Sequence, residues 1–410
     1  MVDFIVSRGI NAIEPFIRKD MSEANREQVS TLVNTLWNHM TTQISTARNI
    51  STEELNRIAD ELLIRSAKDA KEYKLINDLK YEDEVLAKLK EKAGVEADDK
   101  LPTIALKKLN KTNATNIADS KLKVNSKNKV ALIFAEGEIV SGESREGTMG
   151  SETIAKAIKK ARNDDKVKAI VLRVNSPGGS ALASDVMWRE VTLAKADKPV
   201  IVSMGGVAAS GGYYISCAAD KIYAEASTIT GSIGVFGLIP NMKGMFNNKL
   251  GINIDRVNTN TFSDGLTPFR PLELKEREAL KSMIEDIYSD FTQKVADGRG
   301  MSQANVDSIG QGRVWTGINA KEIGLVDEIG GLNDAIAFAV QTSELEDYRI
   351  LQMPAQQDPF EKMIKDLSGE VRMQILGEDI GQAEHYYRNI KSVISTRGVY
   401  TRLPVEIMVE

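Results

Sequence analysis

The sequence predicts an α/β protein with a parallel β-sheet, and three observations support this fold class. From residue 129 onward, short apolar runs alternate with amphipathic helical patterns, an order typical of βαβ units. Two glycine-rich turns, NSPGGS at 175–180 and GGVAASGG at 205–212, each directly follow an apolar run. Ligand sites of such sheets lie beyond the carboxyl ends of the strands. We therefore expect the functional site where these two turns lie.

The elements of this region can be placed one by one from the apolar pattern. In the first helix, Ile154, Ile158 and Ala161 share one face, as expected of a helix that packs on a sheet. We expect strands at 130–134, 169–175, 199–204 and 221–225, and helices at 151–164, 181–196 and 208–219.

A further feature of the sequence is an internal repeat with an offset near 250 residues. AKEYKLINDL at 70–79 matches AKEIGLVDEI at 320–329, and the helical pattern of 21–37 follows that of 272–288. The second copy continues backwards to about residue 129, whereas the first copy runs out at residue 1, so we expect a chain truncated at its N-terminus. The expected domains are the mostly helical rear half of a first repeat at 1–95, a linker at 96–128, a complete repeat with the candidate site at 129–345, and a C-terminal extension at 346–410.

Composition argues against several classes of function. The net charge of −5 over 410 residues argues against a protein that binds nucleic acid. The single cysteine, Cys217, rules out an internal disulfide framework and a cysteine cluster for zinc, and we expect a buried structural thiol. We expect neither a metal nor an organic cofactor. No apolar run approaches the ~18 residues that span a bilayer, so the chain alone is expected to be soluble.

The most informative segment is VAASGGYYIS at 207–216, in which small residues surround Ser210. Ser210 should stand at the first turn of a helix entered from a strand, where unpaired N–H groups gather. The N–H of Gly211 and an N–H of Gly178 or Gly179 could then converge as an oxyanion hole. The alternative is that these glycines only form tight turns and allow close helix packing. Two such turns in one βαβ layer favour the oxyanion hole.

A serine nucleophile requires a general base, and few residues of this sequence could serve as one. The chain has two histidines, His39 in the first copy and His385 in the C-terminal extension. Each is expected to be a surface or packing residue, so a Ser-His-Asp triad is not expected. The remaining common solution is a serine–lysine dyad, in which a lysine loses its proton in an apolar site.

Three motifs, VNSPGGS, GGVAASGGYY and TGSIGV at 230–235, resemble those of signal peptide peptidase A, a family of serine proteases. With its repeat, the chain resembles the long, two-repeat bacterial form (protease IV) over 11–95 and 129–340. The resemblance implies a fold related to the Clp protease and crotonase families. It also implies Ser210 as the nucleophile of a serine–lysine dyad, an oxyanion N–H from the NSPGG turn, and a hydrogen bond between Ser232 and the lysine.

The same resemblance implies where the intact protein works. Its substrates would be cleaved signal peptides, and its site of action would be the bacterial inner membrane. It would form a homotetramer and associate with the membrane through a segment that is absent from this chain.

This sequence departs from the family pattern at the position of the lysine that acts as the general base. In the long form the lysine precedes the residues that match AIEPF at 12–16, and Ile10 occupies that position here. Lys19 lies nine residues later and does not replace it. We therefore expect a weakly active or inactive chain from an intact parent that is a peptidase. Two alternatives stay open: a crotonase-like acyl-CoA enzyme, which needs the oxyanion turns but no serine nucleophile, and a non-catalytic scaffold on the same fold.

Overall fold

The computed structural model describes most of the chain. The described residues are 2–6, 14, 20–96, 99, 101–103, 122–123, 125–249, 251, 262, 264–354 and 398–402, with the backbone alone for 2–6 and 398–402. Contacts divide the chain into two compact units, one of residues 33–122 and the other of residues 1–32 and 123–410.

The larger unit is built on a mostly parallel sheet. Its central strands run in the order β9-β7-β5-β2-β13, and each is parallel to its neighbours. β11 continues the sheet antiparallel to β9, while β8 pairs with both β7 and β12. These strands are β2 (Lys129–Glu136), β5 (Val167–Ser176), β7 (Val200–Ala209), β8 (Lys221–Ala224), β9 (Ile229–Gly231), β11 (Val314–Thr316), β12 (Glu328–Ile329) and β13 (Arg349–Met353).

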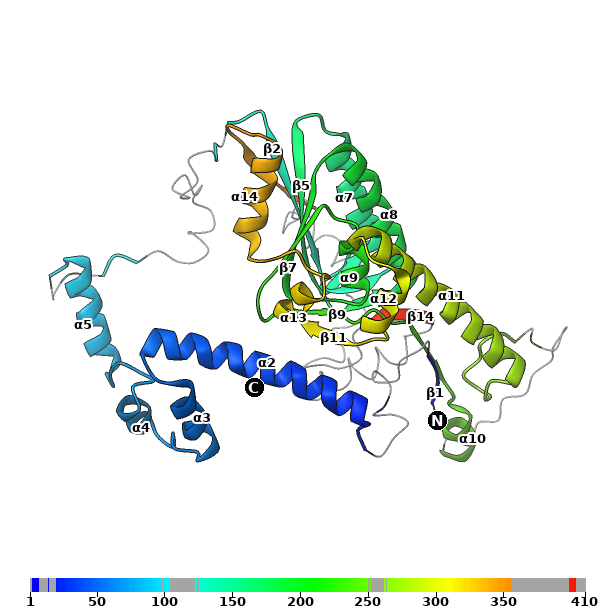
Figure 1. Ribbon diagram of the computed structural model, residues 1–410, viewed down its shortest axis with the longest axis horizontal. Coiled ribbons are helices and arrows are strands. Elements are labelled where there is room, and N and C mark those ends of the chain that lie inside the picture. The colour runs from blue at the N-terminus through cyan, green and yellow to red at the C-terminus, as the bar shows by residue number, and fades with distance from the viewer. Residues whose placement is uncertain are drawn as a thin grey trace. The chain divides into compact units, whose positions relative to one another are not determined.

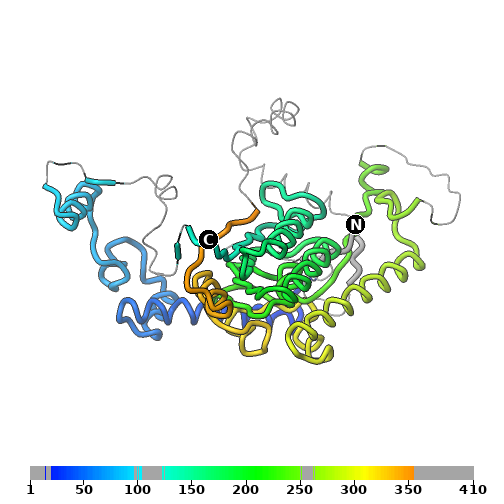
Figure 2. The backbone as a smooth tube through the Cα atoms, turned by 90° about the horizontal axis from the view of Figure 1, so that it is seen from above, coloured from blue at the N-terminus to red at the C-terminus, as the bar shows by residue number. Residues whose placement is uncertain are grey.

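Helices cover both faces of this sheet, as Figure 1 shows. α14 (Leu332–Thr342) lies on one face, and α7 (Ser151–Asn163) and α8 (Ala181–Asp197) lie on the other. From above, α7 and α8 lie side by side (Figure 2). Most side chains of β2, β5 and β7 are buried, which is why these strands read as continuous apolar runs rather than alternating ones.

The two covering helices follow the sequence prediction closely. Ile154, Ile158 and Ala161 are all buried on one face of α7. α8 begins after Ser180, whose Oγ accepts a hydrogen bond from the Ala183 N–H at 3.3 Å. Such a serine cap satisfies one of the N–H groups that a helix start leaves unpaired.

The structure differs from the prediction at the third strand. β7 does not end at Met204 but continues to Ala209, so the helix after it, α9 (Gly211–Ser216), begins at Gly211 rather than at residue 208. Residues Val207 to Ala209 stay in the sheet because they pair in parallel with β9. The run of Gly and Ala carries no periodic apolar signal, so nothing in the local sequence extends the strand. Ser210 therefore lies at the junction of strand and helix.

A second sheet contains strands in the order β1-β10-β14-β6-β3-β4. β3 is parallel to both β4 and β6, whereas β14 is antiparallel to both β6 and β10. β1 is antiparallel to β10, so segments from near both ends of the chain contribute to the sheet that contains Gly178 and Gly179. The strands are β1 (Val2–Val6), β3 (Glu138–Val140), β4 (Thr148–Gly150), β6 (Gly178–Ser180), β10 (Phe236–Pro240) and β14 (Gly398–Arg402).

The smaller unit is helical in its described part. Ser51 and Ser66 cap the starts of two of its helices through their side chains, and Leu55 and Ile58 are buried. The helices are most of α2 (Glu23–Arg48), then α3 (Thr52–Asp60), α4 (Ala67–Glu72) and α5 (Glu82–Ala93).

The larger unit contains a second series of helices with matching lengths and spacings. α2 and α11 (Leu274–Arg299) are both 26 residues long. α12 (Gln303–Ile309) begins after the capping residue Ser302, as α3 begins after Ser51. α13 (Gly317–Glu322) and α14 come next in the places of α4 and α5, and α10 (Lys243–Lys249) precedes α11. The repeat seen in the sequence is thus also a repeat of helices.

No helix in the described part of the chain is both long and apolar enough to cross a membrane.

Candidate active site

Ser210 occupies the sharp turn between β7 and α9. Its backbone has φ 54° and ψ −115°, a region that residues other than glycine rarely adopt. The Ser210 N–H donates to the Gly231 carbonyl at 2.8 Å, and the Tyr214 N–H donates to the Ser210 carbonyl at 2.8 Å. A strained strand–serine–helix turn is the device by which α/β hydrolases hold a nucleophilic hydroxyl.

The Ser210 hydroxyl is buried without a hydrogen-bond partner in the described part of the chain. The residue is 1% exposed, and its Oγ has no partner among the described residues. Leaving a buried hydroxyl unpaired costs about 1–3 kcal/mol. From the sequence we expect the Ser210 hydroxyl to be accessible to a bound acyl group. In this structure the hydroxyl is instead buried and has almost no contact with solvent.

The structure brings the two glycine-rich turns together. Ser176, in the first turn, pairs with Ala208 in the register of β5 and β7. A Cβ on Gly212 would lie 2.8 Å from the Ser176 carbonyl oxygen, closer than side-chain atoms come to a carbonyl. Glycine at this position therefore allows the start of α9 to lie against the first turn.

The N–H groups expected to form the oxyanion hole differ in their hydrogen bonding. Gly211 is the first residue of α9, where no preceding helical carbonyl can accept its N–H. The Gly178 N–H donates to Ser176 Oγ at 3.2 Å, and Ser176 Oγ donates to a backbone carbonyl at 2.7 Å. A Cβ on Gly179 would come within 2.1 Å of the Ile139 carbonyl oxygen. The Gly178 amide is thus already engaged inside its own turn, which the sequence did not predict.

Ser232 lies next to Ser210 at the end of the neighbouring strand. Ala209 pairs with Gly231 in the parallel register, so each serine directly follows one of two paired residues. Ser232 also has a positive φ, 50°, and is 2% exposed. Its Oγ donates to the Gly312 carbonyl at 3.5 Å. The structure therefore juxtaposes the two serines that the sequence singled out.

The base is not found beside the nucleophile in the described part of the chain. Among the described residues no lysine or histidine forms a hydrogen bond with Ser210 Oγ. Ile10, at the position expected for the lysine, lies outside the described residues, as do Lys19 and His385. His39 lies on α2, in the helical part of the first copy.

The N-terminal strand runs towards the Ser232 side of the second sheet. β1 pairs with β10 so that Val2 is opposite Pro240 and Val6 is opposite Phe236. β1 therefore ends at the end of β10 that follows Ser232 in the sequence. The position of Ile10 comes after this strand end in the chain.

A strand from the C-terminal region also lies next to the expected oxyanion glycines. β14 lies between β6 and β10 and is antiparallel to both. Thr401 is opposite Gly179, and Arg402 is opposite Gly178. The sequence predicted only a C-terminal extension here, because strand pairing between residues more than 200 positions apart leaves no local pattern.

A cluster of polar side chains next to α9 was also missed from the sequence. The Tyr214 hydroxyl accepts a hydrogen bond from Lys294 Nζ at 2.9 Å and donates one to Asp185 Oδ1 at 3.0 Å. Lys294 forms an ion pair with the same carboxylate. Burial raises the pKa of Tyr214, and the negative charge of Asp185 raises it further. The three residues come from three different helices, so no sequence motif joins them.

Cys217, at the end of α9, is a structural thiol as predicted. It is fully buried, and burial raises the pKa of its thiol to about 12. A thiol with such a pKa stays protonated at neutral pH and does not act as a nucleophile.

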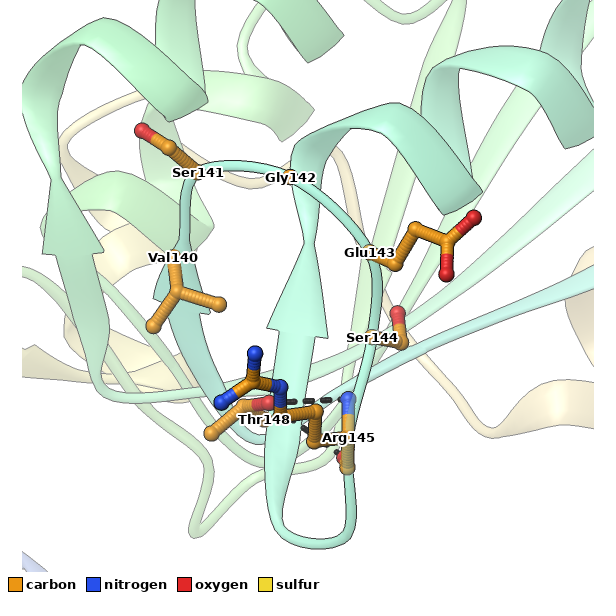
Figure 3. A pocket seen from close by; sticks show the side chains of 7 residues that line it. All are labelled: Val140, Ser141, Gly142, Glu143, Ser144, Arg145 and Thr148. Carbon is orange, nitrogen blue, oxygen red and sulfur yellow. Dashed lines mark hydrogen bonds between the residues drawn. The ribbon is translucent and has the colours of Figure 1, made fainter. Parts of the chain in front are cut away.

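A cavity of about 390 Å³ lies in the loop between β3 and β4 (Figure 3). None of the predicted site residues lines it. The described residues also contain no cluster of His, Cys, Asp and Glu that could hold a metal ion. The residues that line the cavity are Val140, Ser141, Gly142, Glu143, Ser144, Arg145 and Thr148.

The parallel sheet and the serine turn define an α/β protein of the Clp protease type. A family model described as Clp protease matches residues 122–229, which contain both glycine-rich turns and Ser210. The predicted fold class is therefore confirmed.

The chain belongs to peptidase family S49, a family of serine peptidases. The model of that family matches residues 4–96 and 192–346. The chain is 38% identical over 375 residues to protease 4 of Salmonella typhi, a match that covers 89% of this chain and 59% of the relative. It is 38% identical to protease 4 of Haemophilus influenzae, covering 81% of this chain and 54% of the relative. It is 37% identical to the chloroplastic serine protease SPPA of Arabidopsis thaliana, covering 80% of this chain and 48% of the relative.

These matches confirm the family that the motifs around Ser210 and Ser232 indicate. The chain spans about half to three-fifths of the length of the curated relatives it matches. The family match includes residues 4–96, the region that the sequence assigns to the rear half of a first repeat.

Proposed function

We propose that this chain carries the nucleophile of a serine endopeptidase that cleaves extended peptides, with Ser210 as the attacking residue. The observation that carries the proposal is the buried Ser210 hydroxyl, unpaired among the described residues, on a strained turn between strand and helix. Membership of peptidase family S49 supports it. The second glycine-rich turn, in contact with the first through Gly212 and Ser176, supports an oxyanion hole at the same place.

The proposed reaction begins when Ser210 Oγ attacks the carbonyl carbon of a peptide bond. The hydroxyl proton passes to a base, and the carbonyl oxygen takes the negative charge. The Gly211 N–H stabilises that charge, and one such donor is typically worth about 3–4 kcal/mol. The Gly178 N–H adds a second donor when it leaves Ser176 Oγ. The C–N bond then breaks, the amine leaves with a proton, and an acyl ester remains on Ser210. Water hydrolyses the ester and restores the hydroxyl.

The base of this reaction is proposed to be a lysine held by Ser232. Ser232 Oγ lies at the end of the strand next to Ser210, where it can accept or donate a hydrogen bond with a neighbouring amine. Ile10 stands at the lysine position in this chain. We therefore propose slow turnover by this chain and faster turnover by one with lysine at that position, because general base catalysis typically contributes 10²- to 10⁴-fold.

We propose that the substrate binds as an extended strand between β6 and β10, in the place that β14 takes. The register of β14 puts Arg402 opposite Gly178, so a peptide bound in the same way brings a backbone carbonyl to the 178–179 turn. Binding by strand addition gives affinity through main-chain hydrogen bonds and leaves specificity to side-chain pockets. β14 and a substrate would therefore compete for one place.

The partners of the intact protein are proposed from its relatives. A putative signal peptide peptidase SppA of Enterococcus faecium is 35% identical over 196 residues, 48% of this chain. We propose cleaved signal peptides as substrates, a homotetramer as the assembly and the bacterial inner membrane as the location. Attachment to the membrane is proposed through a segment outside this chain.

The experiment that tests the proposal combines peptide hydrolysis with labelling by a fluorophosphonate. The purified chain should hydrolyse a short apolar peptide slowly and should be labelled at one serine. Coenzyme A should neither stabilise the chain nor compete with the label. Thermal stabilisation by coenzyme A without labelling would indicate the crotonase-like alternative. A folded chain that shows neither labelling nor stabilisation would contradict the proposal and would fit a scaffold and an inactive fragment alike.

A further inference from the structure

We propose that Lys294 is a positioning residue for the Ser210 nucleophile and acts through Tyr214. The inference rests on the proposed function of Ser210 and adds a residue to the same site. Its basis is the cluster of Lys294, Tyr214 and Asp185, which joins α9 to the two longer helices α8 and α11.

α9 requires such support because it is short. It has six residues, and an isolated helix of that length is not stable in water. Its first turn includes the hydrogen bond from the Tyr214 N–H to the Ser210 carbonyl, 2.8 Å long. A displacement of Tyr214 therefore moves the Ser210–Gly211 peptide, which carries the nucleophile and the proposed oxyanion donor together.

The Tyr214 side chain is held through both its hydroxyl and its ring. Its hydroxyl accepts from Lys294 Nζ at 2.9 Å and donates to Asp185 Oδ1 at 3.0 Å. Its ring lies 4.5 Å from the ring of Phe291, centroid to centroid, on α11. Tyr214 is 2% exposed, so the loss of either hydrogen bond leaves a buried hydroxyl with one partner fewer.

The Lys294 side chain makes several specific contacts, unlike a lysine that extends into solvent. Its Nζ lies 4.4 Å from the centroid of the Trp188 ring and 5.2 Å from that of Tyr214, and a cation over aromatic faces is attracted by them. Its side chain is 20% exposed, whereas that of its partner Asp185 is 45% exposed. The ammonium group thus lies inside the helix junction, with the carboxylate nearer to solvent.

α11 holds α9 at a second point, beyond Tyr214 at the C-terminal end of α9. A Cβ on Gly298 would lie 2.2 Å from the Cys217 carbonyl oxygen, so the two backbones touch where α9 ends. Tyr214 is nearer to Ser210 in the chain than Cys217 is. Removing the Lys294 contact should therefore loosen the turn at Ser210 while the end of α9 stays anchored.

The test measures the two constants of fluorophosphonate labelling, kinact and KI, on the full chain. Lys294→Met keeps the length of the side chain and removes the charge and the hydrogen-bond donor. We expect kinact to fall about tenfold, because small displacements of a reacting group have effects of this size or larger, and we expect KI to stay the same. Lys294→Arg should recover most of the loss, which replacement of a merely space-filling side chain would not show.

The matched control is Lys281→Met on the same helix. Lys281 is 62% exposed and pairs with Glu285 one turn along, so its replacement should leave kinact unchanged. Equal kinact values for the native chain, Lys294→Met and Lys281→Met would overturn the inference. A native chain that is not labelled at all would overturn the proposed function instead.

A second variant tests the inference if Lys294→Met does not fold. Tyr214→Phe removes only the hydroxyl through which Lys294 acts, and it should lower kinact in the same direction. In the double variant the loss should be no greater than in Lys294→Met alone, because two residues in one pathway are not additive. An unchanged kinact in Tyr214→Phe, or fully additive losses in the double variant, would contradict the pathway through Tyr214.

Discussion

Ser210 and Ser232 are two serines in nearly the same backbone setting with different surroundings. Each comes directly after a strand of the same parallel sheet, each has a positive φ, and each is at most 2% exposed. Ser232 Oγ donates to the Gly312 carbonyl at 3.5 Å, whereas Ser210 Oγ has no partner among the described residues. Strain alone therefore does not distinguish a nucleophile from a supporting residue.

The two serines differ in the residues on their C-terminal side. Ser210 precedes Gly211 and a helix, so N–H groups are available next to its hydroxyl. Ser232 precedes Ile233, which is fully buried, and Gly234. A Cβ added to Gly234 would lie 2.8 Å from the Gly312 backbone. We therefore expect the surroundings of Ser210 to stabilise an oxyanion and those of Ser232 to hold a neighbouring group.

The largest effect is expected from Ser210→Ala. In the Ile10→Lys background peptide hydrolysis should fall by at least about 10³-fold, and in the native chain fluorophosphonate labelling should disappear. Thermal stability should be retained, because the Ser210 hydroxyl has no hydrogen bond to lose among the described residues. The control is Ser308→Ala on the exposed side of α12, with no effect on either assay. Labelling that persists in Ser210→Ala would assign the nucleophile to another residue.

The second-largest expected effect is an increase in the rate of peptide hydrolysis. Ile10→Lys restores lysine at the position that the family resemblance implies, and it should raise kcat/KM for peptide hydrolysis about 100-fold. Ile10→Met, of similar length and without charge, should give no gain. The measurement is initial rates at several substrate concentrations. A rate for Ile10→Lys equal to that of Ile10→Met would show that the base belongs elsewhere.

The substitution Ser232→Ala distinguishes the proposed role of Ser232 from that of Ser210. In the Ile10→Lys background it should lower kcat/KM about tenfold, the loss of roughly one hydrogen bond to a charged group. In the native background it should change the residual rate little, because no lysine stands at position 10. Rates for all four combinations give the coupling directly. The same loss in both backgrounds would contradict a role for Ser232 in holding the lysine.

The smallest effect is expected from removing β14. A chain that ends at residue 397 lacks the strand between β6 and β10 and should be labelled about threefold faster, because a larger fraction of molecules has the place free. A chain that ends at Arg402 keeps β14 and should behave like the full chain. Slower labelling after removal of β14 would mean that the strand supports the site instead of competing for it.

Much of the fold was predictable because buried parallel strands read as apolar runs and helices as periodic ones. The faces of α7 and α8 and the centres of β2 and β5 obey that rule. The end of β7 did not, because glycine and alanine at 205–209 carry no apolar period, and only pairing with β9 keeps them extended.

The candidate site was predictable where it depends on short motifs. Ser210, Ser232 and the glycines at 178 and 179 lie in segments whose composition is unusual by itself, and the structure brings these segments together. The Lys294–Tyr214–Asp185 cluster and the place of β14 depend on contacts between residues far apart in the chain. Such contacts leave no trace in local composition, so only the three-dimensional arrangement reveals them.

The most direct measurement is the mass-spectrometric identification of the residue that carries the fluorophosphonate in the native chain. We expect a single adduct on the peptide that contains Ser210, with Ser232 unmodified. An adduct on Ser232, or a folded chain that remains unmodified under prolonged exposure to the reagent, would contradict the claim that the turn between β7 and α9 presents a nucleophile.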